Sequence, residues 1–164
     1  MQPRIESPAQ LPGVMQALHR LTLPAREAGI PAATRQLVVL RASQINGCSI
    51  CVDMHSRELV AAGERSERIF TVAAWRETPY FSDAERAALA LTEAVTRIAD
   101  RPDPVPDEIW DEAARHYDEA QLGALVLLIA EINVWNRINA ATRQITGDWV
   151  ERLIQVPAAA GQAA

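Results

Sequence analysis

The sequence predicts an all-α protein that forms one domain. Its 164 residues match the usual size of a single domain. The strict alternation of apolar and polar residues that marks a strand is not seen, whereas stretches rich in Ala, Leu, Glu and Arg recur. Prolines are absent between Pro31 and Pro79 and between Pro106 and Pro157, so the longest helices are expected in these two intervals.

Four helices are expected in the first half, at residues 11–21, 31–45, 48–62 and 66–75. The first is expected to end before Pro24, because proline lacks the N–H that a helix interior needs. Pro31 suits the first turn of the second helix. The pair Asn46-Gly47 interrupts the pattern, and Gly63 suits the end of the third helix.

Three helices are expected in the second half, at residues 82–99, 107–117 and 119–144. Two capping boxes support them: Ser82 with Glu85, and Asp118 with Gln121. The proline-rich residues 101–106 form an extended connector. Because residues 122–130 are apolar on every side, the last helix is expected to be the central buried one. Residues 1–164 thus form one domain, with a cysteine-bearing core at about 31–98 and a C-terminal helical part at about 107–145.

Charge and composition exclude several functions. The net charge is −5, so no basic surface for nucleic acid is expected. All sixteen cationic residues are Arg, which excludes a Schiff-base lysine and a phosphate-loop lysine. The longest uncharged run, residues 120–130, is too short to cross a bilayer, and the first ten residues do not resemble a signal peptide. We therefore expect a cytoplasmic protein without membrane contact.

The chemistry is expected at Cys48, Cys51 and His55, and Cys48 and Cys51 are the two cysteines of the chain. If Gly47 ends the preceding helix, both cysteines lie in the first turn of the next one. Unpaired N–H groups and the helix dipole stabilise a thiolate there. Cys51 and His55 are four residues apart, on one helix face, so the histidine can exchange a proton with the thiol.

Three other interpretations of the cysteines remain open. They can be inert, small core residues. They can bind zinc together with His55, with a fourth ligand from His19, His116 or a carboxylate, although no second ligand pair stands out. A thioredoxin-type motif is the third, but it normally follows a strand in a βαβ unit, which this sequence lacks.

The residues from Leu40 to His55, LRASQINGCSICVDMH, resemble the core of the AhpD-like alkyl hydroperoxidases of the carboxymuconolactone decarboxylase superfamily. The stretches Trp75–Ser82 and Glu85–Ala94 are similar to the segment that follows this core in the family. Asn133–Arg137, NVWNR, resembles a later motif of its short members. The likeness covers about residues 31–143.

This resemblance implies an all-helical homo-oligomer, a trimer or hexamer, that reduces hydroperoxides with thiols. Carried over by position, Cys51 is the peroxidatic residue, Cys48 is the proton donor and resolving thiol, and His55 belongs to a proton relay. No metal, haem or flavin is implied. A dithiol partner, such as a lipoyl or thioredoxin-like protein, would reduce the Cys48–Cys51 disulfide.

One position departs from the family. Its relay glutamate lies twelve residues before the first cysteine, where this chain has Gln36. An amide cannot ionise, so Gln36 can only orient His55 or a water molecule. Glu58 lies three residues after His55 and could orient it on the same helix face, but the favoured interpretation is a solvated surface charge. Glu131 could reach the site from the last helix. We expect slower peroxide turnover than in the family.

Two further groups of residues are expected near the cysteines. Ile50 and Met54 are expected to line an apolar pocket beside Cys51 that favours alkyl hydroperoxides. Asn133 and Asn136 lie on a mostly apolar helix and need hydrogen-bond partners, so they are expected to brace the cysteine helix.

Two alternative functions differ in their need for the cysteines. A lactone decarboxylase of the same superfamily would need no cysteine pair. A redox-sensing oligomer without enzymatic activity would change its assembly on oxidation.

Overall fold

A computed structural model describes residues 2–100, 102–147 and 150, and the other parts of the predicted 1–164 domain lie outside this description. Every regular element in the described residues is a helix, as predicted. The α-helices are α1 (Val14–Glu27), α2 (Ala32–Asn46), α3 (Ser49–Ala61), α4 (Ser66–Thr71), α5 (Asp83–Thr96), α6 (Asp107–Ala114) and α7 (Glu119–Thr142). Two 3₁₀ helices, η1 (Pro8–Gln10) and η2 (Val72–Glu77), precede α1 and follow α4.

Both predicted capping boxes are confirmed. The Ser82 side chain accepts a hydrogen bond from the Glu85 N–H, and the Glu85 carboxylate accepts one from the Ser82 N–H at 2.9 Å. Asp118 and Gln121 exchange the same pair of bonds at the start of α7. These bonds satisfy backbone groups that a helix start leaves unpaired, so α5 and α7 begin where the local sequence predicts.

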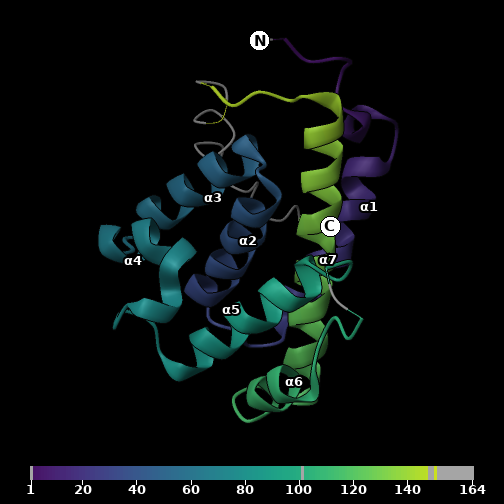
Figure 1. The fold of residues 1–164 in the computed structure, drawn as a ribbon. Helices are drawn as coiled ribbons and strands as arrows, with labels where there is room; N and C mark the ends of the chain where they lie inside the picture. Colours follow the sequence, from purple (N-terminus) through teal and green to yellow (C-terminus); the bar gives the residue numbers. More distant parts are fainter. Residues whose placement is uncertain (1, 101, 148–149, 151–164) are drawn as a thin grey trace, which may run out of the picture.

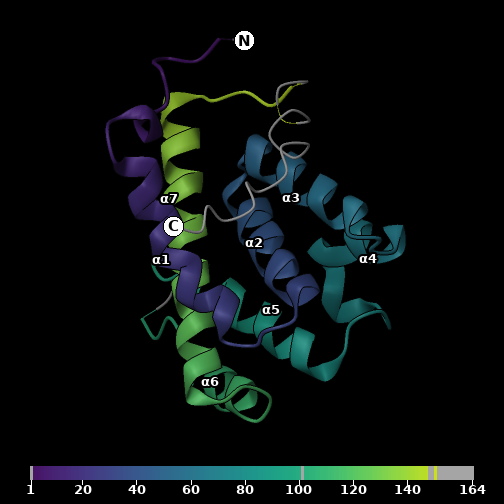
Figure 2. The ribbon, with the colours of Figure 1, turned by 180° about the vertical axis from the view of Figure 1, so that it is seen from behind.

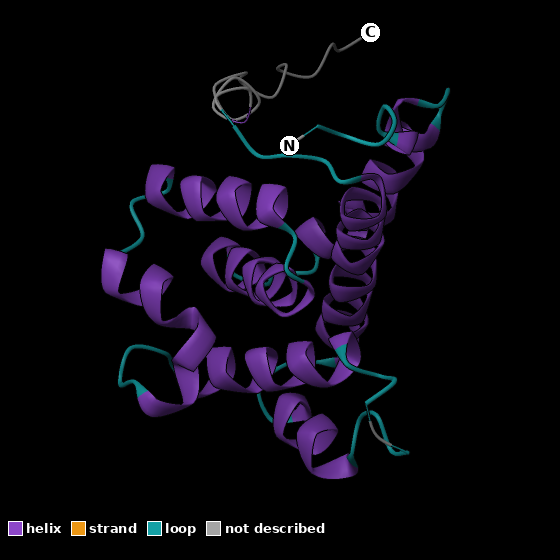
Figure 3. Cartoon of the chain, turned by 45° about the horizontal axis from the view of Figure 1, so that its top comes forward, coloured by secondary structure: helices purple, strands orange, loops and turns teal. Residues whose placement is uncertain are grey.

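The central helix is α2, which packs against α7, α5 and α3 (Figures 1 and 3). Its side chains are buried on several sides, including those of Leu37, Val38 and Leu40. The prediction that the last helix would be buried all round was wrong, because Leu127 and Val134 on α7 are 38% and 39% exposed. Helix α1 lies alongside α7 (Figure 2) and covers one of its sides.

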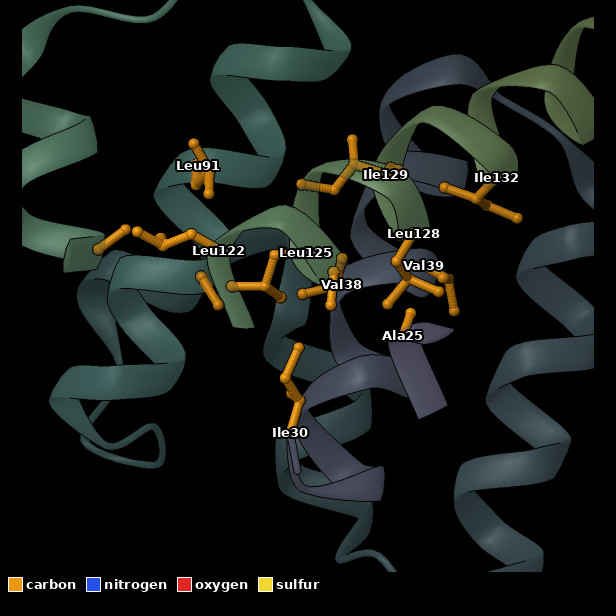
Figure 4. Packing of buried hydrophobic residues seen from close by; sticks show 14 of the residues in the cluster. Ala25, Ile30, Val38, Val39, Leu91, Leu122, Leu125, Leu128, Ile129 and Ile132 are labelled. Atoms are coloured by element: carbon orange, nitrogen blue, oxygen red, sulfur yellow. The ribbon is translucent and has the colours of Figure 1, made fainter. Parts of the chain in front are cut away.

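The main apolar core lies between α2 and α7 (Figure 4). Val38 and Val39 of α2 meet Leu125 and Ile129 of α7 in this cluster. Cys48, Ile50 and Cys51 belong to the same cluster. Burial of such side chains contributes roughly 1.5–3 kcal/mol each. The start of α3 is therefore anchored in the larger of the two apolar clusters of the described residues.

The first helix extends through Pro24 to Glu27, so the predicted end before Pro24 was wrong. A proline in the last turn removes one backbone bond, yet its own carbonyl still accepts from the Ala28 N–H at 3.1 Å. Ala25, directly after it, is completely buried in the main core. Packing against α7 thus offsets the missing hydrogen bond.

The predicted helix at 66–75 divides into α4 and η2, because the backbone leaves α-helical geometry at Thr71 (φ −101°, ψ 4°), and η2 is itself kinked at Ala74. The expected ends of α5, α6 and α7 were two or three residues too late. Among the described residues, no helix is both long and apolar enough to cross a membrane.

Candidate active site

A tight reversal between α2 and α3 brings both cysteines to the start of α3. Gly47 has φ +66°, a left-handed conformation that glycine adopts without steric cost. Its N–H and that of Cys48 donate to the last turn of α2, at the carbonyls of Gln44 and Ser43. Cys48 is the N-cap of α3, and Cys51 follows in its first turn, as predicted.

The two thiols form a buried pair. Their Sγ atoms lie 2.7 Å apart, within hydrogen-bond distance, and both cysteines are free thiols. Cys48 is 3% exposed and Cys51 is 1% exposed. Because the sulfur atoms already touch, a disulfide between them needs only a small movement of the side chains.

The pKa values of the two thiols are shifted in opposite directions. The pKa of Cys48 is lowered to about 6, chiefly by its hydrogen bond with the Cys51 thiol, with smaller contributions from Asn139 and Asn136. Burial opposes this shift. The pKa of Cys51 is raised, first by the hydrogen bond with Cys48 and then by burial. One proton shared by two sulfur atoms explains both directions, so the pair carries one negative charge near neutral pH.

The ring of His55 is held through one nitrogen. Its Nδ1 lies 2.9 Å from Glu58 Oε2 and 3.0 Å from Gln36 Oε1. Both partners accept, so Nδ1 carries the proton that faces them. The other nitrogen, Nε2, is buried and has no hydrogen-bond partner among the described residues. It is therefore open to a reacting group inside the protein.

Glu58 is not the solvated surface charge that the sequence suggested. Its side chain is 33% exposed and pairs with His55 along the same helix face. The reason is the three-residue spacing, which brings the carboxylate under the ring. Gln36 also reaches His55 from α2, as its position predicted, and orients the ring without supplying a charge.

Glu131 lies buried on α7, where the Trp135 indole N–H donates to its carboxylate. Burial raises the pKa of Glu131, whereas that hydrogen bond and the positive charges of His55 and Arg26 act against the rise. This carboxylate therefore senses the charge of His55, although it does not appear among the hydrogen-bond partners of the ring.

A buried network of amides fixes the end of α2. The Asn46 side chain donates to Asn133 Oδ1 at 3.0 Å and to Asn136 Oδ1 at 2.8 Å. Asn136 in turn donates to Ser43 Oγ at 3.1 Å. Asn133 and Asn136 therefore have the predicted partners, and those on α2 lie immediately before the cysteine helix; Asn133 also donates to Thr96 Oγ1 on α5 at 3.3 Å.

Asn139 is the residue of this site that the sequence prediction missed. Its amide nitrogen lies 3.4 Å from Cys51 Sγ and 3.8 Å from Cys48 Sγ. The available signal was the three-residue spacing of Asn133, Asn136 and Asn139, which places their side chains along one side of α7. That spacing does not reveal which amide reaches a sulfur atom.

Metal binding finds no support in the described part of the chain, where no group of three or more His, Cys, Asp and Glu side chains is placed to hold an ion. His116 instead lies near Glu112, on an exposed part of the surface.

Two cavities lie away from the cysteines. One, of about 580 Å³, is lined by residues that include Pro31, Ser82 and His116, and the other, of about 460 Å³, lies between α3 and α4 beside Phe70. Neither lining includes a cysteine. Ile50 packs with Cys51 in the main core, and Met54 is partly exposed.

The comparisons with known proteins agree on the family. Residues 12–94 match the model of the carboxymuconolactone decarboxylase family. The chain is 43% identical to YdfG of Bacillus subtilis over 116 residues, which are 71% of this chain and 78% of YdfG. It is also 34% identical to YnjA of Escherichia coli over 71% of its own length, and that match spans 62% of YnjA. A shorter stretch of 43 residues, 26% of this chain and 24% of the relative, is 49% identical to the alkyl hydroperoxide reductase AhpD of Bradyrhizobium diazoefficiens.

Solved structures show the same fold. ATU0492 of Agrobacterium tumefaciens, described as a candidate AhpD antioxidant defence protein, superposes with a TM-score of 0.82 and 32% identity, covering 89% of this chain and 99% of that one. The apo debrominase Bmp8 superposes with a TM-score of 0.74 at 23% identity, covering 87% and 76%, which is a likeness of fold alone. With an AhpD-like fold and a family model that spans half of its residues, the chain belongs to the carboxymuconolactone decarboxylase family.

Proposed function

We propose that the protein is a thiol-dependent oxidoreductase that reduces alkyl hydroperoxides. The observation that carries this proposal is the buried Cys48–Cys51 pair, with sulfur atoms 2.7 Å apart at the start of a helix. His55 lies one turn further along the same helix. The AhpD relative and ATU0492 support the same chemistry.

In the first step, the shared proton moves to Cys48 and leaves a thiolate on Cys51. This thiolate attacks the terminal peroxide oxygen, the O–O bond breaks, and the Cys48 thiol protonates the departing alkoxide. The products are an alcohol, a sulfenic acid on Cys51 and a thiolate on Cys48.

In the second step, the Cys48 thiolate attacks the sulfur of the sulfenic acid. The S–S bond forms, and hydroxide leaves as water with a proton from protonated His55. Two electrons pass from the dithiol to the peroxide. We propose that a dithiol partner, either a lipoyl or a thioredoxin-like protein, then reduces the disulfide.

The test is a peroxide reaction on the reduced protein, in which free thiols are counted and sulfenic acid is trapped. Wild type, Cys48→Ser and Cys51→Ser are compared with cumene hydroperoxide. Rapid thiol loss in wild type and trapping on Cys51 in Cys48→Ser are expected. Reaction of all three at the rate of a free thiol would refute the peroxidase proposal, and trapping on Cys48 alone would reverse the two roles.

The family model favours a second candidate, a lactone decarboxylase. That reaction needs no thiol, so a variant with Ser at both positions separates the candidates. Decarboxylation of a cyclic lactone acid that survives the double substitution would support the second one.

A further inference from the structure

We propose that Asn139 is a catalytic residue that directs the negative charge of the dithiol to Cys51 and so selects the attacking sulfur. The assignment deepens the proposed function, on which it rests for the identity of the nucleophile. It starts from the two sulfur contacts of the Asn139 amide, at 3.4 Å to Cys51 and 3.8 Å to Cys48.

The dithiol needs a donor of this kind because it is buried. A thiolate that leaves water loses the hydrogen bonds that stabilise its charge, and protein N–H groups must replace them. Asn136 lowers the pKa of Cys48 as well, but by less than Asn139 does, and its amide nitrogen also donates to Ser43 Oγ at 3.1 Å. Asn139 makes both of its amide contacts with sulfur atoms.

The Asn139 amide lies nearer to one sulfur atom than to the other, and this difference affects which sulfur atom carries the negative charge. The start of α3 favours charge on its N-cap residue, Cys48, which the Cys51 thiol also stabilises. Attack by Cys51 requires the opposite distribution. The Asn139 amide lies 0.4 Å nearer to Cys51 (3.8 Å against 3.4 Å), so its bond strengthens as the charge moves there.

Helix α7 holds the amide in place. Asn139 lies in the last turn of α7, and its carbonyl accepts the Gln144 N–H at 2.9 Å where the chain leaves the helix. One turn earlier, Asn136 ties α7 to α2 through Asn46 and Ser43. The distance from Asn139 to the sulfur atoms therefore depends on the packing of α7 against α2, and a mobile loop plays no part in it.

The test measures each sulfur alone. Cys48→Ser leaves Cys51 as the remaining thiol, and Cys51→Ser leaves Cys48. The rate of alkylation by iodoacetamide is followed against pH in each background, with and without Asn139→Ala. We expect the substitution to slow Cys51 roughly tenfold at neutral pH, as loss of a hydrogen bond to a charged group does, and to slow Cys48 by less than about threefold.

Two further variants serve as controls for this interpretation. Asn133→Ala removes an amide of the same network that touches neither sulfur, so any loosening of the packing of α7 against α2 should slow Cys51 no more than Cys48. Asn139→Asp keeps the size of the side chain but removes the donor, so it should slow Cys51 at least as much as Asn139→Ala. Circular dichroism checks that each variant is folded.

The outcomes separate this inference from the proposed function. Equal slowing of both thiols, or no slowing, would overturn the role of Asn139. If wild type reacts with cumene hydroperoxide no faster than a free thiol, yet Asn139→Ala slows the alkylation of Cys51 selectively, the peroxidase proposal fails and the assignment of Asn139 stands.

Discussion

At the scale of single residues, the surroundings of His55 differ from those that the family resemblance implies. Gln36 stands where the resemblance implies a relay glutamate, and a carboxylate on the helix of the histidine itself, Glu58, lies 2.9 Å from the same ring nitrogen. In the second step of the proposed reaction, this carboxylate would balance the positive charge on the ring that donates the proton. Glu58 thereby supplies the charge that Gln36 lacks.

Because Gln36 and Glu58 contact the same ring nitrogen, we predict that a carboxylate introduced at position 36 compensates for the loss of the one at position 58. Glu58→Gln should lower the rate of disulfide formation with cumene hydroperoxide by roughly ten- to a hundredfold, because general acid catalysis is weakened. Gln36→Glu should raise the rate in wild type, and it should restore much of the rate lost in Glu58→Gln. Stopped-flow thiol counting measures both. A double variant as slow as Glu58→Gln would contradict the idea that the two positions serve one ring.

The lowered pKa of Cys48 predicts a pH dependence of stability. The unfolded thiol keeps its proton up to its usual pKa of 9.0, whereas the folded one loses it above about 6. Between these values the unfolded chain binds more protons, so the free energy of unfolding should rise with pH in this window. Above pH 9.0 the raised pKa of Cys51 acts in the opposite direction.

Urea unfolding under reducing conditions, at about pH 6 and about pH 8, measures this effect. Wild type should gain stability at the higher pH, and Cys48→Ser should gain less, because the remaining thiol has no partner thiol. An identical gain in both proteins would show that other groups cause it.

At the scale of the elements, the reversal at Gly47 decides where both cysteines lie. A Cβ atom at this position would meet no other atom within 4 Å, so the cost of a side chain is conformational alone. Gly47→Ala should lower the free energy of unfolding by about 1–2 kcal/mol, the cost of a left-handed backbone. Chemical unfolding measures it.

Gly123 provides the matched control for this substitution. It is a helical glycine of α7 with open space around it, so Gly123→Ala should stabilise the protein by about 0.5–1 kcal/mol. A Gly47→Ala variant as stable as wild type would show that the backbone relaxes at the reversal.

The contact between α2 and α7 depends on polar groups as well as on the core. Asn136 is 1% exposed and bonds to Asn46 and Ser43. Asn136→Ala should cost about 2–3 kcal/mol, because it leaves buried polar partners unsatisfied. Thermal unfolding tests this. An unchanged melting temperature would contradict the bracing role of the network.

At the scale of the whole molecule, apolar residues on the outside of α7 point to assembly. Leu127 and Val134 are seven residues apart, share one face of the helix, and are more than one-third exposed in the single chain. We propose that this face belongs to the homo-oligomer, a trimer or hexamer, that the family resemblance implies. The oligomer would bury this face.

Light scattering coupled to size-exclusion chromatography tests the assembly. Wild type should elute as an oligomer, and Leu127→Glu combined with Val134→Glu should give smaller species, because the charges cannot be buried without partners. A monomeric wild type would contradict the assembly, and an unchanged oligomer in the double variant would place the interface elsewhere.

The local sequence determined the helices and the order of the reactive residues. Capping boxes and proline positions act within one or two turns, so the starts of α5 and α7 follow from them directly. The spacing of Cys48, Cys51 and His55 places them on one side of the first turns of a helix for the same reason. Pro24 misled the prediction because packing of α1 on α7 outweighs one missing bond.

Only the tertiary structure decided which groups meet the sulfur atoms and which helix is central. Asn139 reaches Cys51 across 88 positions of sequence, and its contact depends on how α7 packs against α2. Likewise, α2 is buried on several sides between α7, α5 and α3, whereas the more apolar α7 keeps one face exposed. Periodicity reports which residues prefer burial, but the choice of partner arises from packing between distant segments, which no local pattern encodes.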